Sequence, residues 1–155
     1  MTKIVVPDAC VFNKLFLSEH DSHEATLFFS ACTQSNMKLI VPELFKYEVL
    51  ESIRSCNQPI HTGLDLLSTM QAAILTITSP SNEVWLLAEE IAKTGHEKSG
   101  YPSMYDSIYH ALAIQSGGVF LTADKRHYAK VQEYGHITLL ENWESIFIDG
   151  HTAKH

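Results

Sequence analysis

Two kinds of segment alternate along the 155-residue chain. Short runs of apolar, partly β-branched residues, each bounded by Pro, Gly, Asn, Ser or a charged residue, predict buried strands. These runs lie at residues 4–6, 39–41, 74–77, 119–121 and 137–140. Between several of them, apolar residues recur at the three- and four-residue spacing of an amphipathic helix. We expect helices over residues 21–34, 80–93 and 103–116, and a further helix after Pro42.

The order of these segments predicts an α/β fold. Strands that alternate with helices over five cycles are typical of a parallel sheet with helices on both faces. Because no internal repeat or linker-like stretch divides the chain, we expect residues 1–148 to form a single domain and residues 149–155 a C-terminal tail. Ligands of such sheets bind beyond the carboxyl ends of the strands, so functional residues should be sought there.

Composition excludes several classes of protein. With 45% apolar and 19% charged residues, the chain is typical of a globular domain and not of a disordered one. Its 18 acidic and 11 basic residues give a net charge of −7, which argues against a general coat for nucleic acid. The three cysteines are widely spaced without a CxxC pair, so we expect small core or near-core residues and neither a disulfide framework nor a zinc site.

The sequence predicts a cytoplasmic protein without a membrane segment. The longest charge-free windows, residues 66–82 and 107–123, are interrupted by polar residues, Gly or Pro, and neither can span a bilayer. At the amino terminus, an acidic residue follows only three apolar ones, whereas a signal peptide needs a longer apolar stretch.

Three aspartates are predicted to lie at the carboxyl edge of the sheet. Asp8 follows the first strand, Asp124 follows the fourth, and Asp106 lies in the first turn of the helix that leads into the fourth strand. Each alone is explained as a helix-capping or first-turn acid. Three carboxylates on one edge would repel each other unless a cation lies among them, and oxygen ligands suit Mg²⁺ or Mn²⁺.

A fourth carboxylate is expected from the helix after the second strand. Glu43 and Glu48 both lie in this segment, and the spacing alone leaves the choice between them open. No GxSxG, GxxxxGK or GxGxxG motif is present, so serine hydrolases, P-loop NTPases and dinucleotide enzymes have no local support.

Four acidic motifs in this order resemble those of PIN-domain ribonucleases, particularly the VapC-like toxins of prokaryotic toxin–antitoxin pairs. The matching segments are residues 5–11 (VVPDACV), 42–49 (PELFKYEV), 103–113 (SMYDSIYHALA) and 121–125 (LTADK). The resemblance spans nearly the whole chain and implies a three-layer α/β/α domain with a mainly parallel sheet of about five strands. It implies a metal-dependent endoribonuclease.

The resemblance assigns roles to individual residues. Asp8, Glu48, Asp106 and Asp124 become the catalytic acids that bind Mg²⁺ or Mn²⁺. Glu48 is preferred to Glu43 because the family's acid precedes an aliphatic residue after a proline-led helix start, as Glu48-Val49 does here. Such ions bind the scissile phosphate and activate a water that attacks the phosphorus in line, leaving a 5′-phosphate.

The chain has one basic cluster, Lys125, Arg126 and Lys130, directly after the last acid. We expect these side chains to hold backbone phosphates of the RNA, with a solvated helix face as the alternative. On a helix, positions 126 and 130 share a face that position 125 does not. Thr122, beside the last acid, is counted with the substrate-binding residues, and its hydroxyl could also orient a carboxylate.

Other residues near the predicted site have two interpretations. Tyr101 and Tyr105 are candidates for stacking on bases, although the helical pattern places Tyr105 in the core. His110, one turn after Asp106, is expected to be a semi-buried histidine with a hydrogen-bond partner. His20 and His23 are expected on the surface.

The resemblance also implies partners: an RNA substrate, a small antitoxin and a second copy of the chain in a homodimer. Candidate dimer surfaces are the apolar helices around Phe28 and Phe29 and around Trp85. Trp143 and Phe147 are expected to dock the end of the chain.

Two alternative functions remain. One is a catalytically idle PIN-like domain that binds RNA or serves assembly. The other is a phosphatase or receiver domain that uses Asp8 as a phospho-acceptor, which is disfavoured because Cys10 occupies the position where a haloacid-type phosphatase needs a second acid.

Overall fold

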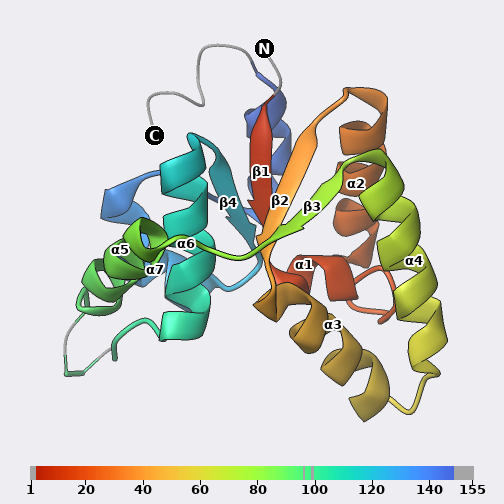
Figure 1. The fold of residues 1–155 in the computed structure, drawn as a ribbon, viewed down its shortest axis with the longest axis horizontal. Coiled ribbons are helices and arrows are strands. Elements are labelled where there is room, and N and C mark those ends of the chain that lie inside the picture. Colours follow the sequence, from red (N-terminus) through yellow and green to blue (C-terminus); the bar gives the residue numbers. More distant parts are fainter. Residues whose placement is uncertain (1–2, 96, 99, 149–155) are drawn as a thin grey trace.

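The chain folds around a five-stranded parallel sheet (Figure 1). The structure is a computed structural model and describes residues 3–148 except residues 96 and 99. In the order β3-β2-β1-β4-β5, every neighbouring pair of strands is parallel. The strands are β1 (Ile4–Pro7), β2 (Lys38–Pro42), β3 (Leu75–Thr78), β4 (Val119–Thr122) and β5 (Ile137–Leu139). All five predicted strands are therefore confirmed to within about a residue or two.

Helices cover both faces of the sheet and confirm the predicted α/β/α layers. They are α1 (Ala9–Asn13), α2 (Ser22–Gln34), α3 (Leu44–Ser55), α4 (Ile60–Ala73), α5 (Asn82–Ala92), α6 (Met104–Ser116), α7 (Lys125–Val131) and the 3-10 segments η1 (Gln132–Tyr134) and η2 (Leu140–Phe147). Figure 1 shows α5 and α6 on one side of the sheet and α2 and α4 on the other. No helix in the described part of the chain is both long and apolar enough to cross a bilayer.

Helix α4 was not expected from the sequence pattern. Its glycine, Gly63, is where the helix meets α3: a Cβ atom there would overlap the end of the Ile53 side chain. The glycine, which lowers helix propensity, thus allows the two helices to pack closely without displacing Ile53. The short helix α1 was also not expected.

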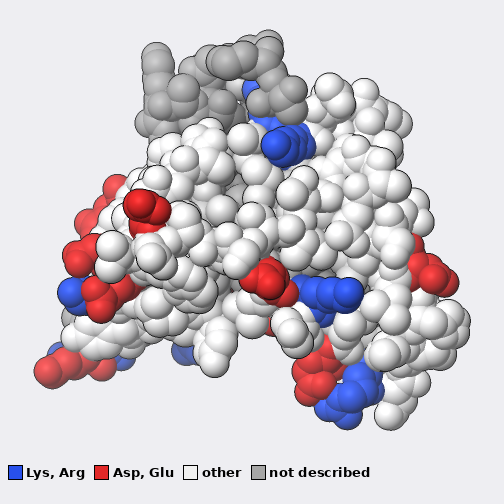
Figure 2. Space-filling model, viewed as in Figure 1, with Lys and Arg blue, Asp and Glu red and all other residues white. Residues whose placement is uncertain are grey.

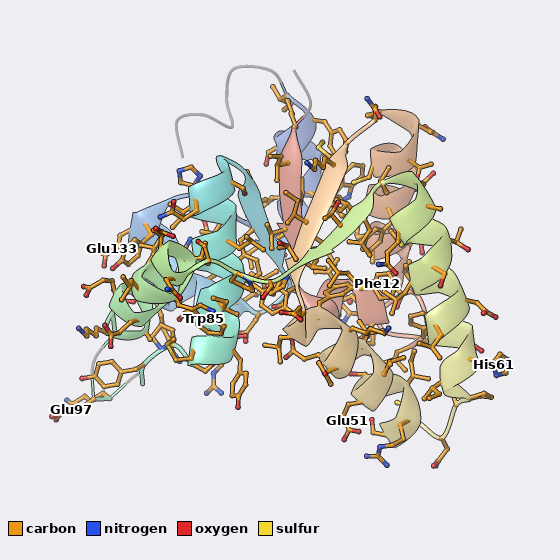
Figure 3. The ribbon with its side chains drawn as sticks, in the orientation of Figure 1. Phe12, Glu51, His61, Trp85, Glu97 and Glu133 are labelled. Atoms are coloured by element: carbon orange, nitrogen blue, oxygen red, sulfur yellow. The ribbon has the colours of Figure 1, made fainter. Side chains whose placement is uncertain are left out.

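An aromatic cluster fills the layer between the sheet and α1 to α3. Phe12 contacts the rings of Phe29 and Phe45 at centroid distances of 5.8 and 5.3 Å, and Phe28 packs on Phe29 at 5.0 Å. Figure 3 shows Phe12 inside the molecule, while Glu51 and His61 lie at its periphery. Phe28 and Phe29 are buried in this core, so their own rings are not available to the dimer surface predicted on their helix.

The last described segment closes the core over α2. Trp143 packs against Phe28 and Phe147, and its indole Nε1 donates a hydrogen bond of 2.7 Å to Oε2 of Glu24. This contact confirms that Trp143 and Phe147 dock the end of the domain, while the tail predicted at residues 149–155 lies outside the described residues.

The three cysteines differ in how far they are buried. Cys32 is buried and Cys10 is half-buried, as expected, but Cys56 is exposed just after α3, so its predicted core position is wrong. All three are free thiols.

Candidate acidic site at the carboxyl edge of the sheet

Asp8 is the most buried of the four predicted acids. The end of β1 carries it to the N-cap of α1, where its backbone N–H donates to the carbonyl oxygen of Leu121 at 2.8 Å. The residue is only 8% exposed. Burial, followed by the nearby charges of Asp106 and Glu48, raises the pKa of its carboxyl group to about 7, against hydrogen bonds from Thr122 and Cys10 that lower it. This carboxylate therefore has a deficit of positive charge around it.

Thr122, the last residue of β4, connects two of the acids. Its hydroxyl donates to Oδ2 of Asp8 at 3.0 Å and accepts from the backbone N–H of Asp124 at 3.1 Å. The side chain is fully buried. Thr122 therefore orients Asp8 and has no surface to offer a substrate, which corrects its place among the substrate-binding residues.

Asp124 begins helix α7 as its N-cap. Its Oδ1 accepts a hydrogen bond of 3.0 Å from the backbone N–H of His127, so the capping role that the sequence allowed is present. Unlike Asp8, Asp124 is exposed.

Glu48 approaches the site from α3. It is half-buried, and its Oε1 accepts a hydrogen bond of 2.5 Å from the hydroxyl of Tyr109 on α6. Burial raises the pKa of Glu48, and the charge of Asp106 adds to this effect against the Tyr109 hydrogen bond. Glu43, the alternative, is exposed at the start of α3. The geometry thus brings Glu48, and not Glu43, within electrostatic reach of Asp8.

Asp106 lies in the first turn of α6. Its backbone N–H donates to Oγ of Ser103, the N-cap residue, at 3.0 Å, which fixes the start of the helix. Its side chain is 38% exposed, and Oδ2 lies 4.0 Å from Nδ1 of His127. Because Asp106 raises the pKa of both Asp8 and Glu48, these three carboxylates share one electrostatic environment.

His127 is a site residue that sequence reasoning did not identify. It is 4% exposed, and the centroid of its ring lies 5.8 Å from that of Phe120. Its Nε2 has no hydrogen-bond partner among the described residues. Burial lowers its pKa, while Asp106 and Asp124 oppose that change. Only the fold brings residue 127 beside Asp106.

His110 follows the non-catalytic interpretation. It is fully buried, and Nε2 lies 2.8 Å from the carbonyl oxygen of Gly135, while Nδ1 has no partner. Burial lowers its pKa to about 4, so the ring is neutral near pH 7. The residue is more deeply buried than expected, and the proposed surface positions of His20 and His23 are confirmed.

The donor set fits a hard divalent cation that retains water. Asp8, Glu48, Asp106 and Asp124 offer only carboxylate oxygens, and the pKa of Asp8 is raised first by burial and then by the negative charges of Asp106 and Glu48. Within residues 3–148, apart from 96 and 99, no three His, Cys, Asp or Glu side chains lie close enough to enclose an ion. Mg²⁺ commonly uses one or two carboxylates directly and keeps several waters, so direct contact with all four is not required.

The basic side chains of α7 line two hollows. Lys125, whose Nζ lies 3.3 Å from Oε2 of Glu141, shares one of them with Arg126 and Asp124. Arg126 and Lys130 line the other, together with Lys98 from the loop before α6. Lys98 is distant in sequence, so the basic cluster contains a member that the spacing did not indicate.

Tyr105 is not a core residue. It is 65% exposed in the first turn of α6, and Tyr101 in the preceding loop is 53% exposed. The prediction that Tyr105 packs in the core is therefore wrong, and its ring is available at the edge of the site.

Solved structures share this fold at low sequence identity. VapC20 of Mycobacterium tuberculosis, described as a toxin that cleaves the sarcin-ricin loop, aligns with a TM-score of 0.61 at 12% identity over 81% of this chain and 93% of that one. VapBC2 of Rickettsia felis, solved with a DNA fragment from its promoter, aligns with a TM-score of 0.64 at 12% identity over 88% and 96%. PAE2754 of Pyrobaculum aerophilum aligns with a TM-score of 0.56 at 19% identity, over 90% of this chain and 85% of that one.

A family model matches the chain, although no curated protein sequence does. The model of the PIN domain matches residues 5–133, a span that includes all four acids and, apart from Ile4, strands β1 to β4. The chain belongs to the PIN domain family.

Proposed function

We propose that this protein is a metal-dependent endoribonuclease and the toxin of a type II toxin–antitoxin pair. The observation that carries the proposal is the buried carboxylate of Asp8, whose pKa is raised to about 7 beside Glu48 and Asp106. Such a group is expensive to keep charged without a cation, and perturbed carboxylates of this kind concentrate at functional sites. Membership of the PIN domain family supports the same activity.

The proposed cofactor is Mg²⁺ or Mn²⁺, held by Asp8, Glu48, Asp106 and Asp124. Such an ion supplies a Lewis acid for the scissile phosphate and lowers the pKa of the attacking water. The chain itself holds the carboxylates in place.

Two neutral hydroxyls perform this positioning. The Thr122 hydroxyl donates to Asp8, and the Tyr109 hydroxyl donates to Glu48. Each occupies one oxygen of its carboxylate, and the second oxygen of Asp8, Oδ1, accepts only a long hydrogen bond of 3.5 Å from the backbone N–H of Cys10. Because neither hydroxyl carries charge, the negative potential that would attract a cation is preserved.

The RNA strand is proposed to pass over Arg126 and Lys130. Figure 2 shows basic side chains in separate groups on the face in view, with no continuous basic surface. The hollow lined by Lys98, Arg126 and Lys130 lies beside the helix that Asp124 begins. Lys125 is a weaker candidate since it pairs with Glu141.

Partners follow from the same proposal. VapBC2, one of the structural neighbours, is by name a complex of two components, which supports a small antitoxin as partner here. The acidic site could receive an Arg or Lys of that antitoxin in place of the metal. A homodimer could form through α5, where Trp85 and Leu86 are 44% and 65% exposed. A toxin that cleaves RNA would act in the cytoplasm.

The experiment is cleavage of a structured RNA by purified protein in Mg²⁺, in Mn²⁺ and in EDTA. We expect products with 5′-phosphates in either metal, none in EDTA, and none from Asp106→Asn. The exposed variant Asp65→Asn on α4 is the matched control and should cleave normally. RNA binding without cleavage under all conditions would refute the enzyme and favour an idle RNA-binding domain.

A further inference from the structure

Three buried polar atoms near Asp106 have no hydrogen-bond partner among the described residues. They are Nε2 of His127, Nδ1 of His110 and Oγ of Ser107. Ser107 and His110 are fully buried, and His127 is 4% exposed. A buried polar atom without a partner is costly, because it has given up its hydrogen bonds to water. Three such atoms in one region indicate a polar ligand that the side chains themselves do not supply.

The packing of the two histidine rings brings these atoms together. The ring centroids of His110 and His127 lie 6.5 Å apart, and each of them also lies 5.8 Å from that of Phe120. Ser107 lies three residues before His110 on α6, and helical side chains lean toward the amino end, so the His110 ring lies over the turn that contains Ser107. The three atoms therefore gather between the amino-terminal turns of α6 and α7.

The contacts of the two rings show which ligand fits. The carbonyl oxygen of Gly135 can only accept, so the hydrogen of the His110 ring lies on Nε2, 2.8 Å away. Burial lowers the pKa of His110 to about 4, which leaves Nδ1 of the neutral ring as an acceptor. In His127, Nδ1 faces the carboxylate of Asp106 at 4.0 Å, which favours the hydrogen on Nδ1 and leaves Nε2 as a second acceptor. Two neighbouring acceptors need a ligand with two hydrogens to donate, and water is the smallest one.

We propose that one buried water donates hydrogen bonds to Nε2 of His127 and Nδ1 of His110 and accepts one from the hydroxyl of Ser107. Two hydrogen bonds of about 2.9 Å through one oxygen join nitrogens up to about 5.8 Å apart. That span is compatible with rings whose centroids lie 6.5 Å apart. Three hydrogen bonds are also what a buried water typically makes. The water then satisfies all three of the unpartnered atoms.

The water makes His127 a positioning residue for two acids. The ring of His127 lies 4.0 Å from Oδ2 of Asp106, and its backbone N–H donates to Oδ1 of Asp124 at 3.0 Å. A ring held at Nε2 by the water keeps Nδ1 toward Asp106, and groups that orient a ligand in this way strengthen metal binding. The positioning role rests on the proposed nuclease function, whereas the water site itself does not.

The water site is tested by a crystal structure of the wild-type protein in EDTA, at a resolution that shows ordered waters. We expect one water within hydrogen-bond distance of Nε2 of His127, Nδ1 of His110 and Oγ of Ser107. A dry contact, in which the two rings bond directly to each other or to Ser107, would overturn the proposal.

The positioning role is tested by Mn²⁺ affinity, measured by titration calorimetry on two variants of His110. The amide of glutamine reaches as far from the backbone as Nε2, and that of asparagine reaches only as far as Nδ1. His110→Gln should therefore keep the hydrogen bond to Gly135, lose the bond to the water and bind Mn²⁺ about tenfold more weakly. His110→Asn should lose the bond to Gly135 and melt at a lower temperature, but bind Mn²⁺ within about twofold of wild type. Ser116→Ala, at the far end of α6, is the control and should bind as wild type.

The opposite ranking of the two His110 variants in melting temperature and in Mn²⁺ affinity is the signature of the positioning role. An Mn²⁺ affinity that simply follows the melting temperature across the variants would show that His110 acts only on the fold, and would overturn that role. If wild type does not bind Mn²⁺ but its crystal structure contains the bridging water, the metal-dependent nuclease proposal fails and the water site stands.

Discussion

Replacing Asp8 with asparagine should stabilise the metal-free protein at neutral pH. In the folded state, burial, Asp106 and Glu48 raise the pKa of Asp8 from 3.8 to about 7. Between these two values the folded state binds more protons than the unfolded state, so the folding stability falls as the pH rises. The penalty is complete above about pH 7 and absent below about pH 4.

The structure sets the size of this effect. A change in pKa from 3.8 to about 7 corresponds to about 4 kcal/mol, since each tenfold change in acidity is worth about 1.4 kcal/mol. Asparagine keeps an oxygen that can accept the hydrogen bond from Thr122 and loses the longer one, of 3.5 Å, that Oδ1 of Asp8 accepts from the backbone N–H of Cys10. Allowing for relaxation of the site, we expect Asp8→Asn to be about 1–4 kcal/mol more stable than wild type at pH 8 in EDTA.

The assay is urea unfolding of both proteins in EDTA between pH 5 and pH 8. The stability difference should grow with pH, and Asp65→Asn, an exposed change on α4, should show no such growth. Saturating Mg²⁺ should reduce or reverse the difference, because the ion stabilises only a folded protein that binds it. A difference that stays constant with pH, or a variant less stable than wild type throughout, would refute the proposed electrostatic strain at Asp8.

Three further predictions concern the metal, the support of the site and the substrate. Mn²⁺ should raise the melting temperature of wild type in a concentration-dependent way, as followed by calorimetry, and an unmoved melting curve would count against the ion site. Thr122→Val should lower the free energy of unfolding in urea by about 1–3 kcal/mol and slow cleavage, because it removes a buried donor to Asp8 and an acceptor for the N–H of Asp124. An unchanged cleavage rate would show that Thr122 does not position the acids. The double variant Arg126→Gln with Lys130→Gln should bind RNA more weakly, and the log-log slope of its RNA affinity against salt should flatten by roughly one unit per lost contact, whereas Lys125→Gln should have little effect. Equal effects of the two changes would show that the cluster acts only through its charge.

The sheet could be predicted from the sequence because its strands are buried on both faces. Each strand is then a nearly continuous apolar run bounded by turn residues, and the alternation with helices implies parallel pairing. The helix α4 could not be found in this way. Gly63 of this helix packs closely against Ile53 of α3, and a tertiary contact of this kind leaves no periodic signal in the sequence.

The common edge of the three aspartates was also predictable. Parallel strands end on the same side of a sheet, so the residues after β1 and β4 must lie near each other. The choice of Glu48 over Glu43 needed the family resemblance, and the structure supports it through the Tyr109 hydrogen bond. Spacing alone could not make that choice.

Other features of the site depend on where each helix begins relative to the sheet. The pattern of α6 places Tyr105 and Tyr109 on one apolar stripe, but the first turn extends past the core, so only Tyr109 is buried. Lys98 and His127 reach the site region through a loop and a helix turn whose positions the sequence pattern does not encode. These residues could be found only from the folded chain.

The most direct test of the metal-dependent nuclease is a matched pair of glutamate variants on α3, assayed for RNA cleavage in Mn²⁺. Glu48 faces Asp8 and Asp106, whereas Glu43 is exposed at the start of the same helix. The account predicts that Glu48→Gln slows cleavage at least about 100-fold while Glu43→Gln cleaves at the wild-type rate. Cleavage at the wild-type rate by Glu48→Gln would contradict it.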